Sequence, residues 1–298
     1  MTIIPLFFSG LLSFLPFFGE EKLPVFDPPP QQYFREIPSL EENYSLFSPH
    51  ESFQNIEVSA HSAVVLDVAT GVSLFTKNER EHRSIASLTK LMTAILVLEQ
   101  YHDQLDTSAT IPSLAMEVEG SRMFLLSGEE MTIANLLRGL LIRSANDAAV
   151  TLANTVGGTQ EHFVELMNRR AHYLGLENTH FTNPHGLDNP ENYSTARDVA
   201  FLAKYALTFP FIRETVSLRE ETVFDVSGKF SHTLKTTNEL LGTSFPIFGL
   251  KTGTTEEAGE CFVGLATLDK RDFLIVLLGS ENRFQDTKAL LWSLENSL

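Results

Sequence analysis

A serine and a lysine lie three residues apart in "SIASLTKLMTA", residues 84 to 94. In a helix, residues i and i+3 lie on one face, so Lys90 can reach the hydroxyl of Ser87. A neutral lysine could take the serine proton, and the positive end of the helix dipole would stabilise the oxyanion that follows. An ordinary lysine is charged at pH 7, so burial and a second cation must lower its pKa. Taken alone, the pair is more typical of a helix cap.

A second polar group lies in "IRSANDAA", residues 142 to 149, between two segments with helical periodicity. The hydroxyl of Ser144 could relay protons there, and the amide of Asn146 could hold a substrate carbonyl. The same segment also suits capping by Ser144, Asn146 or Asp147. By itself it does not distinguish the lining of a cleft from a helix cap.

A third group is "GLKTGTT", residues 249 to 255, where Lys251 interrupts an apolar strand and is followed by Thr252 and Gly253. A glycine at this point allows another backbone to approach the strand. Lys251 could supply the second cation that Lys90 requires. This motif is the most specific of the three, because it fixes three adjacent residue types.

The predicted elements place these motifs around one sheet. Alternating apolar residues and turn residues predict strands near both ends of the globular part, at 61–68, 72–77, 246–254, 260–268 and 272–280. Helices are predicted between and after them, with Thr159 as an N-cap, at 87–101, 131–143, 146–158, 159–175, 195–208 and 284–298. A hairpin is expected around Ser227 and an ordered loop at 181–194. The simplest architecture is an antiparallel sheet with an inserted helical lobe and a cleft between them.

Composition excludes several classes of protein. The 298 residues are 43% hydrophobic and include 23 Phe, which excludes disorder throughout and allows a large core. A net charge of -16 disfavours non-specific nucleic-acid binding, because an acidic surface repels phosphates. The single cysteine, Cys261, cannot form an internal disulfide, and "ECFVGLAT" predicts that it is a small buried core residue.

The first 56 residues differ from the rest. Residues 3–18 carry no charge, and Pro5 and Pro16 interrupt a run shorter than the roughly 20 residues of a membrane helix. No Lys or Arg precedes this run and no small-residue cleavage site follows it before Glu20. Either the true start of the protein lies upstream, or residues 1–19 are an unusual signal- or anchor-like segment; a hydrophobic tail packed on the protein is the other interpretation. The proline run in residues 20–56 predicts an extended linker, and the globular part then begins near residue 57.

The motifs S-x-x-K, S-x-N and K-T-G occur here in order, as in penicillin-binding proteins and, nearly, class A β-lactamases. From about Ala60 to Trp292 the chain resembles the serine-type D-alanyl-D-alanine carboxypeptidases, the low-molecular-mass penicillin-binding proteins. The stretches "TGVSLFTKN", "GSRMFLLSGE" and "TNPHGLDNPENYSTARD" extend the resemblance. It implies an α/β (α+β) fold of the β-lactamase/DD-peptidase kind, with a five-stranded antiparallel sheet flanked by helices. Within a catalytic domain at 57–298, the sheet lobe would comprise about 57–86 and 245–298, and the helical lobe about 87–244.

The resemblance also implies a role for each motif. Ser87 would be the acylated nucleophile and Lys90 its base, and the N–H groups of Ser87 and Thr254 would form the oxyanion hole. The residues that would line the cleft or hold the terminal carboxylate of the substrate are Ser144, Asn146, Lys251, Thr252, Gly253 and Arg283. His185 would order its loop by hydrogen bonding, because lysine is the base in this family.

The implied substrate is a peptidoglycan stem peptide that ends in D-Ala-D-Ala, and β-lactams would acylate the same serine. We expect no cofactor, no metal and no nucleic acid. The protein would act outside the cytoplasm, with membrane association through residues 3–18. Many members of the family carry a further β-rich domain and an amphipathic helix; from the sequence we expect neither here, with the catalytic domain as the last domain.

Three other functions share part of this pattern. A β-lactamase would need an E-x-x-L-N signature, which the sequence lacks, since Glu165 is followed by Leu-Met-Asn. An endopeptidase that cuts peptidoglycan cross-links would share every motif. A catalytically silent peptidoglycan-binding or β-lactam-sensing module is disfavoured by the presence of Ser87, Lys90 and Lys251.

Overall fold

A computed structural model describes Phe53 and residues 56–297 of the chain. These residues all fall within one compact unit. The signal- or anchor-like segment at 1–19, with its expected membrane association, lies outside the described residues, as does most of the linker at 20–56.

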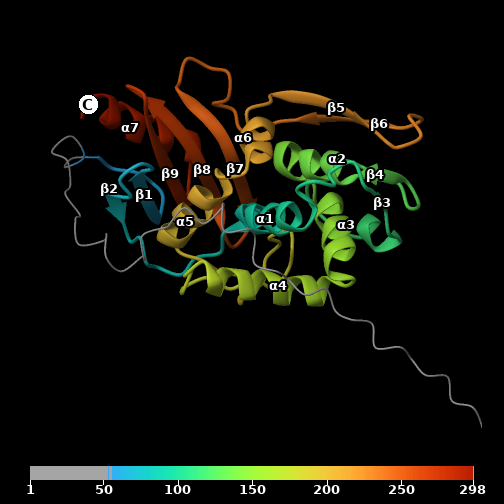
Figure 1. Ribbon diagram of the computed structural model, residues 1–298. Helices are drawn as coiled ribbons and strands as arrows, with labels where there is room; N and C mark the ends of the chain where they lie inside the picture. The colour runs from blue at the N-terminus through green and yellow to red at the C-terminus, as the bar shows by residue number, and fades with distance from the viewer. Residues whose placement is uncertain (1–52, 54–55, 298) are drawn as a thin grey trace, which may run out of the picture. The chain divides into compact units, whose positions relative to one another are not determined.

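Five antiparallel strands form the central sheet, in the order β2-β1-β9-β8-β7. Its strands are β1 (Ser62–Asp67), β2 (Ser73–Lys77), β7 (Ile247–Thr255), β8 (Gly259–Leu268) and β9 (Arg271–Ser280). Strand β1 pairs with β9 in register from Ser62 opposite Leu278 to Asp67 opposite Phe273. The two ends of the globular part therefore meet in the middle of one sheet, which confirms the predicted sheet (Figure 1).

Helices cover both faces of this sheet. Helix α7 (Arg283–Glu295) packs against β8 and β9 on one face, and α5 (Ala196–Ala206) packs against β1, β8 and β9. The cluster beneath α7 includes Phe262, Phe273 and Leu290, and Phe53 belongs to it with 5% exposure. The Phe53 ring lies 5.7 Å from that of Phe75, centroid to centroid. Phe53, which lies within the predicted linker at 20–56, therefore packs on the core of the sheet.

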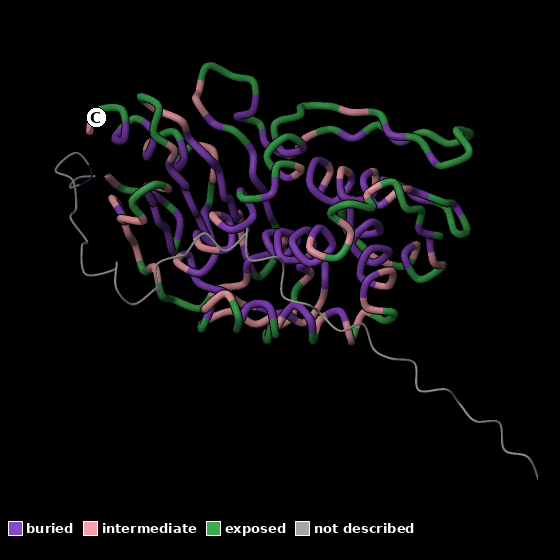
Figure 2. Tube along the Cα trace, viewed as in Figure 1, coloured by how far each residue is buried: buried purple, intermediate pink, exposed green. Residues whose placement is uncertain are grey.

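The helices between the two strand groups are α1 (Lys90–Tyr101), α2 (Ile133–Arg138), α3 (Asn146–Gly157), α4 (Gln160–Tyr173), α5 and α6 (Pro210–Val216). Helices α3, α4 and α5 pack against α1. Every residue of α1 from Lys90 to Leu98 is buried, as the purple helix at the centre of Figure 2 shows. The predicted central helix is thus confirmed, and it supplies a rigid support for residues at its first turn.

Several local predictions need correction. Met131 and Thr132 lie in β4 (Glu130–Thr132), which pairs with β3 (Ser108–Thr110), so the helix predicted from residue 131 starts at Ile133. Its last turn, η5 (Gly139–Arg143), is a π-helix. Helix α6 was not predicted. The hairpin around Ser227 is confirmed as β5 (Glu220–Phe224) and β6 (Ser231–Lys235), and Thr159 caps α4 by accepting from His162 N at 3.2 Å.

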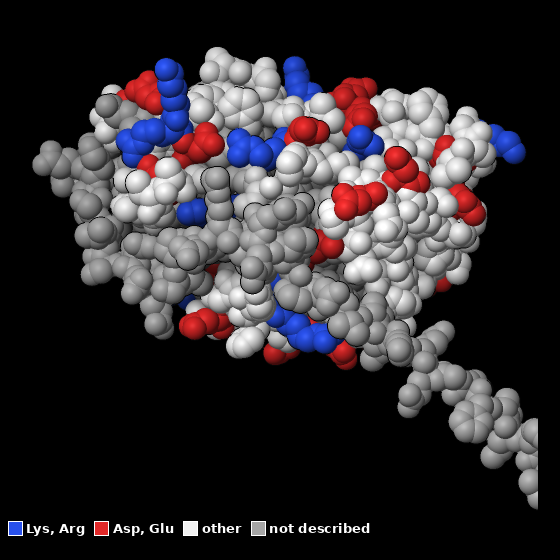
Figure 3. Space-filling model, viewed as in Figure 1, with Lys and Arg blue, Asp and Glu red and all other residues white. Residues whose placement is uncertain are grey.

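The surface carries charges of both signs. In Figure 3, acidic and basic side chains of the described residues are interspersed on the visible face, without a broad basic field. This distribution agrees with the net charge of -16. Among the described residues, none of the helices has the length and apolar character that a bilayer crossing requires.

Candidate active site

Ser87 lies in a short 3-10 turn, η3 (Ala86–Thr89), immediately before α1. Ala86 has a left-handed φ of 46°, a conformation that is uncommon outside glycine and frequent at functional sites. Ser87 does not cap the helix. Its Oγ instead accepts a hydrogen bond from Lys90 Nζ at 2.8 Å. The cap interpretation is therefore wrong for this serine, and the regular helix begins at Lys90 rather than at Ser87.

Lys90 is fully buried, and its Nζ also donates to the carbonyl oxygen of His185. Burial, and then the nearby Lys251, hold the pKa of Lys90 well below its usual value, while Asp147 acts in the opposite direction. The amine is thus shifted toward its neutral form. A neutral amine at hydrogen-bond distance from a hydroxyl can take its proton.

Lys251 lies on β7 and reaches across to the helical side of the site. Its Nζ donates to Ser144 Oγ and to the carbonyl oxygen of Thr252, both at 2.8 Å. Burial first, and then the charge of Arg283, lower the pKa of Lys251 to about 7. Ser144 follows the π-helical turn η5 in a left-handed conformation, with φ 63°. Ser144 is thus the C-cap residue of η5, and its hydroxyl accepts from Lys251.

Asn146 is the first residue of α3, and its side chain is oriented by the loop above it. Asn146 Nδ2 donates to the carbonyl oxygen of Glu119 at 2.6 Å. Asn146 Oδ1 is buried and has no hydrogen-bond partner in the described part of the chain. A buried acceptor without a partner has lost its hydration, so it favours an incoming N–H donor.

Gly253 lets β7 approach the turn that carries Ser87. A Cβ atom at Gly253 would lie 2.9 Å from Ser87 N and 2.9 Å from the Cβ of Ala86, which is closer than real contacts allow. The predicted close approach at this glycine is therefore observed. It brings the backbone of the strand against η3, beside the amide of Ser87.

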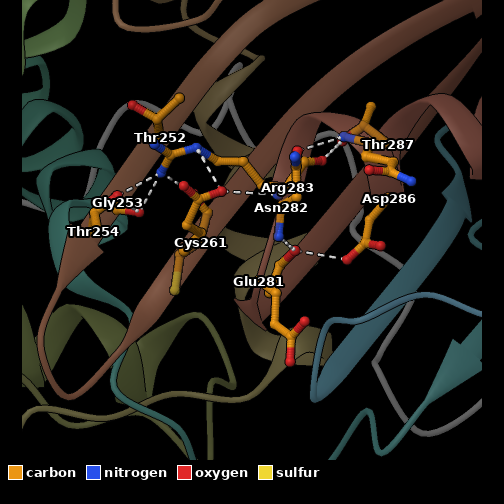
Figure 4. A network of polar contacts seen from close by, with 12 residues as sticks. Thr252, Gly253, Thr254, Cys261, Glu281, Asn282, Arg283, Asp286 and Thr287 are labelled. Carbon is orange, nitrogen blue, oxygen red and sulfur yellow. Dashed lines mark hydrogen bonds and ion pairs between the residues drawn. The ribbon is translucent and has the colours of Figure 1, made fainter.

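Arg283 begins α7, and its side chain extends over β7 and β8 (Figure 4). Arg283 Nη1 donates to the carbonyl oxygen of Gly253 at 2.6 Å and to Thr254 Oγ1 at 2.7 Å. Its Nε lies 3.7 Å from a carboxylate oxygen of Glu260. The guanidinium is thus fixed beside Thr254, and it is one cause of the low pKa of Lys251.

Two side chains near the motifs were not predicted to belong to the site. The hydroxyl oxygens of Thr237 and Thr252 lie 2.6 Å apart, although the residues are 15 positions apart in sequence. Asp147 was named only as a cap candidate, yet it is fully buried and acts on Lys90. Nothing in the sequence marks Thr237, whereas the position of Asp147 directly after Asn146 could have indicated its proximity.

His185 and Cys261 fulfil their predicted structural roles. The Nδ1 atom of His185 accepts from Leu187 N at 3.2 Å, and burial, followed by Lys90, lowers the pKa of His185 to about 3. This side chain orders its loop in the neutral form. Cys261 is completely buried on β8, and burial raises the pKa of its thiol to about 11. Within the described residues, His, Cys, Asp and Glu form no cluster that could hold a metal ion.

Comparisons with known proteins identify the family of the chain. The profile of a family described as D-alanyl-D-alanine carboxypeptidase, peptidase S11, matches residues 48–282. D-alanyl-D-alanine carboxypeptidase DacF of Bacillus subtilis is 35% identical over 259 residues, which are 83% of this chain and 65% of that protein. D-alanyl-D-alanine carboxypeptidase DacC of Escherichia coli is 36% identical over 258 residues, or 82% of this chain and 63% of that protein. The chain thus spans slightly less than two thirds of the length of these curated relatives.

Solved structures extend the similarity to three dimensions. The crystal structure of the Streptomyces K15 DD-transpeptidase superposes with a TM-score of 0.76 at 32% identity, and covers 82% of this chain and 99% of that one. The crystal structure of the D-alanyl-D-alanine carboxypeptidase DacD from Francisella tularensis gives a TM-score of 0.74 at 30% identity, over 88% of this chain and 75% of that one. The described fold is therefore the α/β fold of DD-peptidases.

Proposed function

Because the chain belongs to the D-alanyl-D-alanine carboxypeptidase family, we propose that it is a serine DD-carboxypeptidase that acts through an acyl-enzyme on Ser87. The observation that carries this proposal is the hydrogen bond of 2.8 Å between Lys90 Nζ and Ser87 Oγ in a site where Lys90 is fully buried. A hydroxyl becomes a nucleophile when a neighbouring group can accept its proton.

In the proposed reaction, neutral Lys90 takes the proton of Ser87, and Ser87 Oγ attacks the carbonyl carbon of the penultimate D-alanine. The negative oxygen of the tetrahedral intermediate is held by the N–H groups of Ser87 and Thr254. The C–N bond then breaks, and the leaving amine receives a proton relayed through Ser144. Water, deprotonated by the same base, finally cleaves the ester and restores Ser87.

Binding of the peptide would use both sides of the cleft. The terminal carboxylate of the substrate would contact the hydroxyl of Thr252 and the cations Lys251 and Arg283, since charge-assisted hydrogen bonds are the strongest available. Asn146 would accept a peptide N–H at its unpartnered Oδ1 and donate to a carbonyl with its remaining amide proton. Gly253 supports the proposal, because it leaves the space in which the strand and the turn of Ser87 come together.

The proposal includes the setting in which the protein works. Its substrate would be a peptidoglycan stem peptide that ends in D-Ala-D-Ala, and β-lactams would acylate Ser87 as covalent inhibitors. Such a substrate implies action outside the cytoplasm. Membrane association through residues 3–18 and their linker is part of the proposal, supported by the apolar sequence alone.

Fluorescent penicillin tests the proposal when wild type is compared with Ser87→Ala and with Ser84→Ala, a matched serine just outside the motif. We expect labelling of wild type and Ser84→Ala and none of Ser87→Ala. D-alanine release from a D-Ala-D-Ala peptide should follow the same order. Equal labelling of Ser87→Ala would overturn the assignment of the nucleophile.

The same assays separate the other candidate functions. Labelling without D-alanine release would favour a β-lactam-sensing module. Rapid loss of the label with continued drug turnover would indicate a β-lactamase. Release of cross-linked stem peptides in preference to free D-alanine would indicate an endopeptidase, which shares every motif of the site.

A further inference from the structure

Asp147 is a fully buried carboxylate next to the proposed catalytic residues. Its oxygens accept hydrogen bonds from the backbone N–H groups of Ala148 at 3.0 Å, Met123 at 3.1 Å and Leu125 at 3.2 Å. All three donors are uncharged backbone groups, and among the residues that the structure describes no cation is hydrogen-bonded to the carboxylate of Asp147. The carboxylate therefore acts as an acceptor for the loop at 123–125 and for the first turn of α3.

The loop that Asp147 holds is also the loop that orients Asn146. Asn146 N donates to the carbonyl oxygen of Ser121 at 2.7 Å, and Asn146 Nδ2 donates to that of Glu119. Gly120 has a φ of 82°, and a Cβ there would lie 2.9 Å from Asn146 Nδ2. The segment 119–125 is thus attached to Asn146 at one end and to the carboxylate of Asp147 at the other. Loss of the hydrogen bonds between this loop and Asp147 would therefore leave Asn146 less firmly oriented.

The charge of Asp147 acts on the base itself. Lys251 on β7 and Asp147 on α3 both shift the pKa of Lys90. Lys90 in turn lowers the pKa of His185, which lies in the loop at 181–194. Of the two that shift Lys90, Lys251 opposes its protonated form and Asp147 favours it. Arg283 in turn opposes the charge on Lys251. Within the described residues, Asp147 is therefore the carboxylate that acts on Lys90, and its effect is opposite to that of Lys251.

We propose that Asp147 is a positioning residue of this site, which holds the loop that orients Asn146 and sets the pH at which Lys90 becomes able to take the serine proton. This inference rests on the proposed role of Lys90 as the base. It assigns two separable effects to one carboxylate. The loop contact governs peptide binding, and the charge governs the acid side of the pH dependence.

The direction of the second effect follows from electrostatics. A carboxylate near an ammonium stabilises the charged form, so Asp147 keeps Lys90 protonated up to a higher pH than it otherwise would. Asp147→Asn removes the charge and retains an acceptor oxygen for part of the loop. Neutral Lys90 is then reached at lower pH. The acid limb of acylation should move to lower pH, while a purely structural residue would lower the rate equally at every pH.

The rate of acylation by fluorescent penicillin, measured from pH 5 to pH 9, provides the test. The ratio of the Asp147→Asn rate to the wild-type rate should rise about tenfold as the pH falls through the acid limb, the effect of removing one nearby opposite charge. Asp147→Glu retains the charge and should keep the wild-type limb, with a raised KM for peptide. Asp198→Asn is the matched control. Asp198 is a buried carboxylate near the start of α5 that accepts from Asn178 N at 2.9 Å, far in sequence from the site lysines. Its ratio should be constant, and a constant ratio for Asp147→Asn would overturn the proposal.

A direct titration of Lys90 tests the role of Asp147 without relying on enzyme activity. The Lys90 resonance of protein labelled with 13C at the lysine Cε, assigned by its loss in Lys90→Arg, should titrate at lower pH in Asp147→Asn than in wild type. Asp147→Ser is a second neutral variant, in case the asparagine variant does not fold. An unchanged Lys90 titration overturns the role of Asp147. Absence of acylation in wild type overturns the proposed function, and the titration still decides the question of Asp147.

Discussion

Two groups of buried ionisable side chains lie toward opposite ends of α1, one at Lys90 and one at Glu99, and their partners differ in character. Glu99 accepts from Arg170 and from the hydroxyl of Tyr205, which lies 2.8 Å from the Glu99 carboxylate. The Arg170 guanidinium also donates to Tyr205 at 2.7 Å, so each member has partners of complementary character. Among the residues that the structure describes, Lys90 and Lys251, in contrast, have only hydroxyl and carbonyl hydrogen-bond partners, and the two lysines repel each other.

The difference separates a structural cluster from a reactive one. Burial raises the pKa of Glu99, but Arg170 and Tyr205 act against it, and the charges stay paired. At the lysines, burial and like charge act together, so their protonated forms are destabilised. Removal of one partner from a buried ion pair strongly lowers the stability of the protein. An uncompensated buried charge is itself destabilising and is typical of functional sites. Substitutions in the two clusters should therefore have opposite consequences.

The largest effect is expected for Lys90→Met. Removal of the proposed base should slow acylation by fluorescent penicillin about 10³-fold, within the range attributed to general bases. The fold should be retained, because methionine fills the buried site without a charge. Arg170→Met, in the other cluster, should acylate within about threefold of wild type under conditions where it is folded. Comparable losses in both variants would remove the functional distinction between the clusters.

A large loss of stability is expected for Arg170→Met. The substitution leaves Glu99 buried without its cation, which typically costs about 3–5 kcal/mol of unfolding free energy. Urea denaturation at pH 7 measures this loss. The double variant Arg170→Met with Glu99→Leu should recover most of it, since no buried charge is left. Failure of the double variant to recover would show that packing, rather than charge, dominates this cluster.

Lys251→Met should stabilise the protein. The pKa of Lys251 is lowered to about 7 from 10.5, so the folded state binds fewer protons than the unfolded state between these two values. Wild-type stability should therefore rise as the pH increases from 7 to 10.5. The cost is largest below pH 7, where substitution should gain about 2–4 kcal/mol at 1.4 kcal/mol per pKa unit, less the lost hydrogen bonds. Urea denaturation across this window measures both effects. An unchanged pH dependence in Lys251→Met would contradict them.

The smallest effect is expected for Thr237→Val, a nearly isosteric change beside the reactive cluster. Loss of its hydrogen bond to Thr252 should leave the Thr252 hydroxyl less well oriented and raise the KM for a D-Ala-D-Ala peptide about 3–10-fold. Thr237→Ser should restore the wild-type KM. Thr233→Val removes the exposed hydroxyl pair with Thr222 and should have no effect. A change in kcat alone would argue against a role in substrate binding.

The sequence predicted the elements that have strong local signals. All five strands of the sheet were expected, because alternating apolar runs and turn residues mark them, and α1 was expected from its apolar periodicity. The three motifs contain residues that the fold brings together, since Lys251 contacts Ser144 and Gly253 approaches Ser87. Helix α6 and strands β3 and β4 are short, and their segments carry weak periodicity, so they were missed.

The remaining features depend on contacts between distant parts of the chain. The 3-10 turn at Ser87 packs against β7. Phe53 is buried because it packs into the hydrophobic cluster beneath α7. The role of Thr237 rests on a tertiary contact to Thr252, and that of Asp147 on the path of the loop at 119–125. None of these follows from residue type or local spacing.

The thiol of Cys261 can be used to measure local opening of the structure around β8. The chain has one cysteine, and this thiol is completely buried in β8 beside the carbonyl oxygens of Ser84 and Ala258. A thiol reagent can reach it only when the residues packed around this part of β8, which include Ser84, open locally. The labelling rate therefore measures how often the core of the site opens. Acylation of Ser87 should slow that labelling, so a single mass-spectrometric measurement would read both chemistry and conformational opening.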